Sequence, residues 1–347
     1  MAYTDIDKPS DYFNTKLYTG TGSSNSITGI GFAPDWVWIK NRGASAHHML
    51  FDKVRDATKS LYSNLTDAET TVSGHVTSFD SDGFTLGDNS GKGSTNGNTE
   101  TYASWNWLGA NGTASNSDGS ITSSVSASTD AGFSIVSYTG TGSAATVGHS
   151  LGVKPSAIFI KNRSSISDWC VYFGTLGATK YLELSNTNAA GTSANTFNNT
   201  EPTSSVFTVN TSSIVNTSGD DYIAYCFAEK QGYSKFGSYI GNGNADGTFI
   251  YLGFKPAFVI AKESSEARDW QLWDNKRLGY NASGGNKNLI PNKTDVEDTY
   301  ADIDILSNGF KLRNSSAADN KVSQTYIYMA FAEAPFVTST GIPTCAR

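Results

Sequence analysis

One motif occurs three times along the chain, and it constrains the fold more than any other feature. Each copy opens with a tyrosine and a glycine-rich turn, at Tyr18, Tyr138 and Tyr239. The turn reads Tyr-Thr-Gly-Thr-Gly-Ser in the first two copies and Tyr-Ile-Gly-Asn-Gly-Asn in the third. A proline follows 16, 17 and 17 residues later, and a hydrophobic run ending in lysine comes after it. Features repeated in this order predict three copies of one structural unit.

Each copy also closes in the same way, on an aromatic stretch that begins at Tyr102, Tyr222 or Tyr326. The opening and closing tyrosines lie 84, 84 and 87 residues apart. A unit of roughly one hundred residues is a common domain size and can bury its own core. We therefore expect domains in series rather than a solenoid of short repeats.

The stretches between the copies set the expected boundaries. Residues 109–132 are rich in Gly, Ser, Thr and Asn, with strand character at 120–125. The connection at 229–234 is short, so repeats 2 and 3 are expected to pack closely and repeat 1 to be freer. The predicted organisation is a polar N-terminal arm at 1–15, repeats at 16–110, 119–230 and 235–336, and a tail at 337–347.

Composition favours an all-β fold. Charged residues make up 16% of the chain and aromatic residues 12%, and small polar residues are abundant. Aromatic residues favour strands, and Gly, Asn and Ser favour turns. Asp82-Gly83 is a hairpin signal of the type I′ kind. Residues 52–64 resemble a helix, but the matching stretches lose the apolar face, so strand-loop-strand is preferred. We expect three tandem antiparallel β-sandwich domains, jelly-roll or lectin-like, with a small barrel per repeat as the alternative.

Charge and hydropathy narrow the class of partner. The net charge is −7 and the pI about 5.1, without the basic stripe of a nucleic-acid-binding protein. No apolar run approaches the roughly 20 residues that cross a bilayer, so no membrane insertion is expected. The N-terminus lacks a secretory signal, which indicates folding in a cytoplasm. Cys170 and Cys226 lie in apolar runs and are interpreted as buried free thiols, with a disulfide between them as the alternative.

No catalytic motif, cofactor motif or metal-ligand spacing is visible, so neither catalytic residues nor a cofactor is expected. His47 and His48 are interpreted as an exposed loop pair. Asp80-Ser81-Asp82-Gly83 resembles the start of a calcium loop, but the twelfth position is Gly91; a turn is favoured and a surface calcium ion left open. The candidate carboxylates for glycoside hydrolysis are Glu69, Glu183, Glu229 and Glu333. Glu229 and Glu333 follow the closing strands and are interpreted as strand-end structure.

Two Asp-Trp pairs are the candidate binding residues. Asp168-Trp169 and Asp269-Trp270 stand at matching places in repeats 2 and 3. Exposed tryptophan rings stack on sugar rings in lectin-like sandwiches, so these residues are predicted to bind a ligand. The remaining tryptophans are interpreted as core; they are Trp36, Trp38, Trp105, Trp107 and Trp273.

Several long phrases carry a resemblance to a known family. They are Asp35-Trp36-Val37-Trp38-Ile39-Lys40-Asn41-Arg42, Ser78-Phe79-Asp80-Ser81-Asp82-Gly83-Phe84-Thr85-Leu86-Gly87, Tyr225-Cys226-Phe227-Ala228-Glu229, Tyr233-Ser234-Lys235-Phe236-Gly237-Ser238-Tyr239 and Ala332-Glu333-Ala334-Pro335-Phe336. Together they resemble a repeated domain of unknown function in virion structural and tail-fibre-like proteins of bacteriophages, particularly marine phages of cyanobacteria and related hosts. The family has no established catalytic residues to carry over.

The resemblance implies a non-enzymatic protein on the virion surface, made in the host cytoplasm. The leading expectation is a tail fibre or tail-associated appendage that contacts a host surface glycan or receptor. A capsid decoration or head-fibre protein is the first alternative, and a polysaccharide-degrading tailspike the second. The chain has no heptads for a coiled-coil stalk. A homo-oligomer, with a trimer favoured, is expected, with the N-terminal arm directed toward the other virion proteins.

Overall fold

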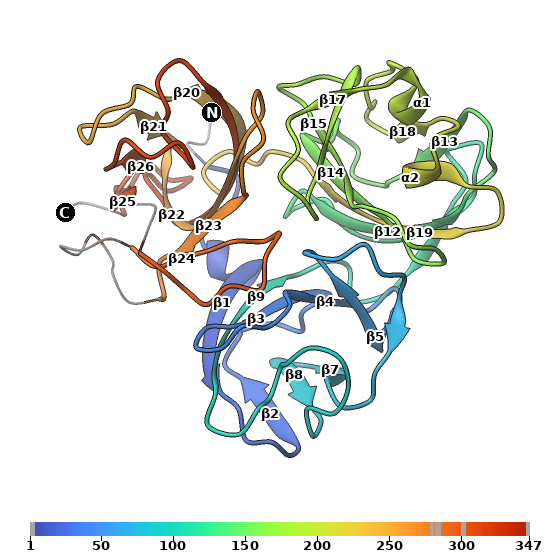
Figure 1. The fold of residues 1–347 in the computed structure, drawn as a ribbon, viewed down its shortest axis with the longest axis horizontal. Helices are drawn as coiled ribbons and strands as arrows, with labels where there is room; N and C mark the ends of the chain where they lie inside the picture. Colours follow the sequence, from blue (N-terminus) through green and yellow to red (C-terminus); the bar gives the residue numbers. More distant parts are fainter. Residues whose placement is uncertain (1–3, 278–280, 282–285, 300–302, 345–347) are drawn as a thin grey trace.

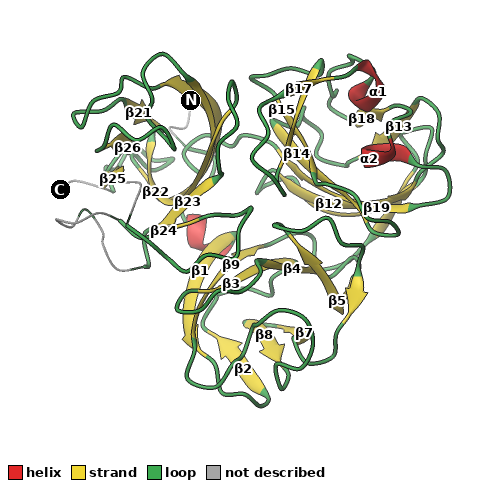
Figure 2. Cartoon of the chain, in the orientation of Figure 1, coloured by secondary structure: helices red, strands yellow, loops and turns green. Residues whose placement is uncertain are grey.

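The computed structural model describes residues 4–277, 281, 286–299 and 303–344. The described chain is all-β, with 43% of residues in strands and 3% in helices (Figures 1 and 2). Its ladders are antiparallel, and none of the sheets in the described residues closes into a barrel. The strands fall into three stretches of sequence, which we call segment 1 (13–107), segment 2 (114–227) and segment 3 (234–335). Each segment contains one large and one small sheet, in a sandwich-like arrangement.

Segment 1 has a six-stranded sheet of order β1-β9-β3-β4-β5-β6 and a three-stranded sheet of order β2-β8-β7. Its strands are β1 (Phe13–Thr19), β2 (Asn25–Thr28), β3 (Trp36–Asn41), β4 (Met49–Asp52), β5 (Asp56–Tyr62), β6 (Thr70–Thr71), β7 (Val76–Asp80), β8 (Gly83–Leu86) and β9 (Thr101–Trp107). The strand-loop-strand interpretation of residues 52–64 is therefore confirmed.

Segment 2 has an eight-stranded sheet of order β10-β11-β12-β19-β14-β15-β16-β17 and a two-stranded sheet, β13-β18. Its strands are β10 (Ala114–Asn116), β11 (Ser123–Ser128), β12 (Phe133–Thr139), β13 (Ala145–Gly148), β14 (Ala157–Asn162), β15 (Cys170–Phe173), β16 (Lys180–Glu183), β17 (Gly191–Thr192), β18 (Val206–Val209) and β19 (Asp221–Phe227). The first two strands come from the stretch that joins segments 1 and 2.

Segment 3 has a five-stranded sheet of order β20-β27-β22-β23-β24 and a three-stranded sheet of order β21-β26-β25. Its strands are β20 (Ser234–Ile240), β21 (Phe249–Tyr251), β22 (Phe254–Glu263), β23 (Gln271–Asp274), β24 (Asn288–Leu289), β25 (Ile303–Leu306), β26 (Gly309–Leu312) and β27 (Thr325–Pro335). The helices are short: η1 (Pro9–Asp11), α1 (Ala194–Phe197) and α2 (Ser213–Asn216). Within the described residues, no helix has the length and apolar character needed to cross a membrane.

The repeated tyrosines face each other across paired strands. Tyr18 pairs with Tyr102, Tyr138 with Tyr222, and Tyr239 with Tyr326. The rings of the three pairs are stacked, with centroids 5.0, 5.2 and 5.0 Å apart. The similar spacing of these tyrosines in the sequence therefore follows from one strand register, used three times.

A glycine stands two positions after each opening tyrosine. It is required there because the loop before the closing strand passes very close to its backbone. A Cβ atom on Gly20, Gly140 or Gly241 would lie 2.2, 2.2 or 2.3 Å from a carbonyl oxygen of the loop before the closing strand. No side chain fits at such a distance, so glycine is needed there. This contact explains why the Gly-x-Gly turn recurs.

The hairpin predicted around Asp82 is present, although its turn differs in detail. Strands β7 and β8 pair through Asp80 and Gly83, so Ser81 and Asp82 form the loop. Among these residues only Gly83 has a positive φ, which is not the expected type I′ geometry. The Asp82 carboxylate accepts hydrogen bonds from the backbone N–H groups of Gly29 (2.9 Å) and Gly31 (2.7 Å). This acidic turn thus ties two loops together.

Each segment encloses its own apolar core, and a further cluster joins all three segments. Trp107, Phe227 and Phe331, the last aromatic residues of the three closing stretches, form a triangle at the centre. Their ring centroids lie 6.4 Å (Trp107–Phe227), 5.9 Å (Phe227–Phe331) and 5.7 Å (Trp107–Phe331) apart. The three segments accordingly surround one centre (Figure 1). The expectation that repeat 1 is freer than the others is wrong, because its large sheet contributes to this shared core.

The N-terminal stretch is packed against the body from the first described residue. The Thr4 hydroxyl donates to the Gln231 carbonyl (2.9 Å), and Ile6 and Phe13 are buried in the central cluster. The interpretation of residues 1–15 as a polar arm therefore needs correction for the described part. Polar residues alternate there with apolar residues that reach the shared core.

Candidate functional site

The two tryptophans predicted to bind a ligand are buried, at 0% exposure for Trp169 and 1% for Trp270. Each indole N–H donates to a backbone carbonyl of the preceding segment: Trp169 to Tyr62 at 2.8 Å, and Trp270 to Glu183 at 3.0 Å. The expectation of exposed rings is therefore wrong. Both rings instead fill the junctions between segments, where no face remains for a sugar.

The partner aspartates bond to residues of their own segments. Asp168 accepts hydrogen bonds from the Ser185 hydroxyl (2.6 Å) and the Asn186 amide (3.2 Å). Asp269 accepts from the Asn292 amide (2.8 Å) and forms an ion pair with Lys293 (2.7 Å). The structure does not bring the two Asp-Trp pairs together into one site.

Three junctions of the same design link the segments. At each one the lysine that ends the hydrophobic run is buried and donates to the carbonyl of a threonine in the neighbouring segment. The three bonds are Lys161 to Thr66 (3.0 Å), Lys262 to Thr187 (3.4 Å) and Lys40 to Thr294 (3.2 Å). Burial lowers the pKa of each lysine to about 8. Segment 2 contacts segment 1, segment 3 contacts segment 2, and segment 1 contacts segment 3. The three junctions therefore close a ring.

Two of the junctions also carry matched ion pairs. Arg163 contacts Glu69 at 2.9 Å, and Arg42 contacts Glu297 at 2.8 Å. At the junction of segments 2 and 3, Ala190 stands in the place of the glutamate, so this ion pair is absent. The matching backbone bond, from the Ala190 N–H to the Ser264 carbonyl, is kept (2.9 Å). The backbone pairing is therefore common to all three junctions, and the ion pair is an addition.

At the junction of segments 1 and 3, His48 takes the position that a tryptophan holds at each of the other two junctions. It is fully buried, and its Nδ1 accepts from the Trp38 indole N–H at 3.0 Å. His47 is half-buried and lies against the Tyr62 ring, with centroids 5.5 Å apart. The expectation of an exposed histidine pair is thus wrong, because the loop is covered by segment 3.

All four histidines of the chain favour the neutral form, so we expect acid to destabilise the protein. Burial lowers the pKa of His47, His48 and His149, and lowers that of His75 to about 4. In the unfolded chain a histidine titrates near pH 6.5, so unfolding takes up protons below that pH. The stability that these groups contribute is therefore present above about pH 6.5 and lost as the pH falls toward 5. Urea unfolding between pH 7.5 and 5, in steps of about half a unit, measures this loss.

His75 offers the cleanest variant for this measurement. Its side chain is buried beside Phe51, and neither ring nitrogen has a hydrogen-bond partner among the described residues. His75→Leu should become more stable than the unsubstituted chain as the pH falls, by up to about 1.4 kcal/mol per pH unit below 6.5. A stability difference that stays constant from pH 7.5 to 5 contradicts this explanation.

The carboxylates considered for hydrolysis are dispersed. Glu69 pairs with Arg55 and Arg163, Glu183 accepts from the Asn186 and Asn188 amides, and Glu333 pairs with Lys255. In the described part of the chain, no three His, Cys, Asp or Glu side chains lie together as metal ligands. Cys170 and Cys226 are buried free thiols, as expected, and Cys345 lies outside the described residues.

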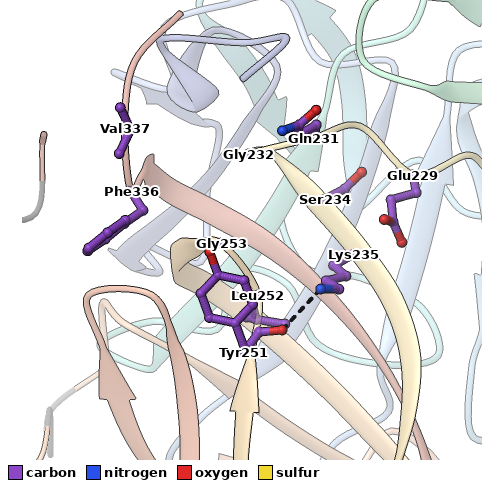
Figure 3. Close-up of a pocket in the computed structure, with 10 residues that line it drawn as sticks. All are labelled: Glu229, Gln231, Gly232, Ser234, Lys235, Tyr251, Leu252, Gly253, Phe336 and Val337. Carbon is purple, nitrogen blue, oxygen red and sulfur yellow. Dashed lines mark hydrogen bonds between the residues drawn. The ribbon is translucent and has the colours of Figure 1, made fainter. Parts of the chain in front are cut away.

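Glu229 borders a surface hollow of about 270 Å³ in segment 3 (Figure 3). The hollow lies between β20 and β21, beside the start of the C-terminal tail. Lys235 donates to the Tyr251 carbonyl at 3.1 Å, and its ammonium lies 5.4 Å from the Tyr251 ring centroid. The lining residues are Glu229, Gln231, Gly232, Ser234, Lys235, Tyr251, Leu252, Gly253, Phe336 and Val337. This hollow combines an exposed aromatic ring with charged and amide side chains, and sequence reasoning did not single it out.

Comparison with known proteins places the chain in a family. No curated protein and no solved structure matches the chain. A family model described as a domain of unknown function matches residues 8–335, which include all three segments and the closed ring of junctions. The chain therefore belongs to the domain of unknown function family DUF7483.

Proposed function

We propose that the protein is a non-enzymatic structural component of a bacteriophage particle, displayed on its surface as a tail fibre or tail-associated appendage. The sequence phrases that resemble virion proteins support this proposal. The closed ring of junctions is the structural observation that favours it, because a rigid body held by buried contacts suits a permanent part of an assembly.

We further propose that the chain consists of three tandem β-sandwich domains related by repetition. Matched tyrosine registers, matched lysine contacts and a separate core in each segment support this division. The shared central cluster makes the three domains one body. Aromatic residues from all three segments fill this cluster, and they support packing of the three domains around one centre within a single chain.

The location on the particle decides between the tail and the capsid alternatives. A cryo-EM map of the particle whose genome encodes the chain is the direct experiment. A tail appendage is expected in tens of copies or fewer, and a capsid decoration in hundreds. Density for the three-lobed body on the shell, or its absence from purified particles, contradicts the tail proposal.

The tailspike alternative leads to a prediction about hydrolysis. Three of the four candidate carboxylates are held by cations or amides as described above, and Glu229 accepts from the Phe236 N–H at 3.3 Å. We therefore expect the purified protein to leave host polysaccharide chains unshortened, as measured by size-exclusion chromatography and reducing-end assays. Shortened products that disappear in Glu183→Gln or Glu229→Gln would overturn the non-enzymatic proposal.

A further inference from the structure

The joining stretch of segment 2 closes one flank of its sandwich. Strand β11 pairs along β12, with Ser124 opposite Ser137. Ile121 and Val125 enter the core of segment 2, at 7% and 3% exposure. Ile121 forms a bridge with Val147 of β13. An extended segment thus fills the flank between the outer strand of the large sheet and the small sheet.

The matching flank of segment 3 lacks this strand. Within the described residues, β20 pairs with β27 and is the outer strand of its sheet, apart from an isolated bridge between Ser234 and Lys230 at its start. The hollow of about 270 Å³ lies between β20 and β21, where the matching strands of segment 2 contact the joining stretch. Ser234 and Lys235, which line it, correspond to the positions that β11 covers in β12.

Segment 1 shows another way to close this flank. Strand β1 is also an outer strand, but the loop between β2 and β3 folds back beside it. Ile30 and Phe32 of this loop are buried, and the Asn14 amide donates to the Ile30 carbonyl at 3.0 Å. In segment 3 only Leu252 and Gly253 connect β21 to β22. The short connection leaves the flank open.

Among the described residues of segment 3, several exposed apolar side chains lie on the strands and loop next to this flank. Ile240, Phe249, Tyr251 and Val322 are 62%, 43%, 55% and 60% exposed. The matching positions in segments 1 and 2 carry small or polar residues, namely Thr19, Ser26, Thr28, Asn98, Thr139, Thr146, Gly148 and Ser218. The three segments have otherwise similar designs, so these apolar side chains have no counterpart in the packing of the sandwich. Exposed apolar patches of this kind mark contact surfaces.

We propose that β20 accepts an extended segment of a partner polypeptide, which adds as a further strand and places aliphatic side chains along the flank between β20 and β21, at the positions that match Ile121 and Val125. Backbone bonds with alternate side-chain pockets are a known mode of peptide recognition. At the start of β20 the Ser234 N–H donates to the Lys230 carbonyl (2.9 Å) and the Phe236 N–H to the Glu229 carboxylate (3.3 Å), so the added strand pairs with the part of the edge that follows, around Ser238. The joining stretch of segment 2 indicates the chemistry of the partner: aliphatic residues spaced as Ile121 and Val125 among serines and threonines. This inference stands on the strand edge and does not depend on a role in a virus particle.

Disulfide trapping tests the register directly. The protein carries Ser238→Cys in a Cys345→Ser background, in which the remaining cysteines, Cys170 and Cys226, are buried. The probe is a synthetic peptide of residues 116–128 with cysteine in place of Ser124, because Ser238 matches the Ser137 that faces Ser124. We expect the mixed disulfide to form at least about tenfold faster than with a scrambled peptide of the same composition.

The matched control is Ser137→Cys in the same background, since β11 already covers that edge. It should show no preference for the ordered peptide. A probe with proline in place of Ser126 loses a backbone donor and should lose the rate advantage. Equal rates for ordered and scrambled peptides overturn the proposal. Preferential formation of a disulfide-linked dimer of the Ser238→Cys protein also overturns it, because the occupant is then a second copy of the chain.

Discussion

Replacement of Phe227 by alanine is expected to lower the free energy of unfolding by about 3–5 kcal/mol. Its ring is 1% exposed and contacts Trp107 and Phe331 in the central triangle. Removal of the ring leaves a cavity where the three sheets meet, and the surrounding strands cannot close it without moving the other two segments. Urea unfolding followed by tryptophan fluorescence measures the change.

Phe249→Ala is the matched control, because Phe249 is 43% exposed and lies on the outer face of β21. It should change the stability by no more than about 0.5 kcal/mol. If the segments share one core, Phe227→Ala shifts a single cooperative transition. Separate transitions, with only one of them shifted, show that the segments unfold independently and contradict the central role of the triangle.

Much of the architecture followed from the sequence because strand pairing preserves spacing. Tyr18 and Tyr102 are directly opposite each other, so the distance between them in sequence is fixed by the strands and loops they enclose. The same register recurs in the other segments. The repeated turn could also be predicted from the sequence, because close backbone contacts require glycine at its first position. The all-β character and the shared strand register were therefore predictable from local rules.

The junctions were harder to predict because the same residue types serve surfaces and interfaces. Trp169 and Trp270 follow an aspartate in a polar stretch, which is also the context of an exposed ligand-binding tryptophan. Burial comes from the neighbouring segment, and a strand pattern does not reveal that neighbour. A signal was nevertheless present: strands such as β3 and β14 are apolar on both faces. One face is covered by the small sheet of its own segment and the other by the shared core.

The lysines at the strand ends carried a second signal. A lysine that ends an apolar run at the same place in each copy suggests a repeated contact rather than a solvated charge. Lys40, Lys161 and Lys262 are all fully buried. The candidate site in segment 3 is instead marked by residues that differ from those at the matching positions of the other segments. Phe249 and Tyr251 depart from the small residues of the other copies, and this departure shows itself only after the strands are aligned by structure.

Asp52→Ala is expected to destabilise the protein by about 3–5 kcal/mol, because it removes the fully buried carboxylate that pairs with Arg55 and leaves only the partly exposed Glu69 beside the guanidinium. Asp52 and Arg55 form an ion pair whose side chains are both 0% exposed, and the Tyr225 hydroxyl of segment 2 donates to the Asp52 carboxylate at 2.6 Å. Segment 3 repeats the arrangement toward segment 1: Asp274 pairs with Arg277 at 2.7 Å and accepts from the Trp105 indole at 3.1 Å.

The junction of segments 2 and 3 has an apolar set of residues in place of this ion pair. Segment 2 has Phe173 and Leu176 where the other segments have aspartate and arginine, and they face the sheet in which Met329 replaces Tyr225. The variant Asp52→Phe/Arg55→Leu/Tyr225→Met copies this apolar set and should recover most of the stability lost in Asp52→Ala. Well-packed apolar residues can replace a buried ion pair without loss of stability, whereas a single unpaired charge in the core is strongly destabilising.

Equilibrium unfolding of the two variants beside the unsubstituted chain makes the comparison, with Asp274→Ala as the matched single substitution. A triple variant no more stable than Asp52→Ala contradicts the interchangeability of the junctions, and an Asp52→Ala protein of unchanged stability shows that the ion pair does not hold segments 1 and 2 together.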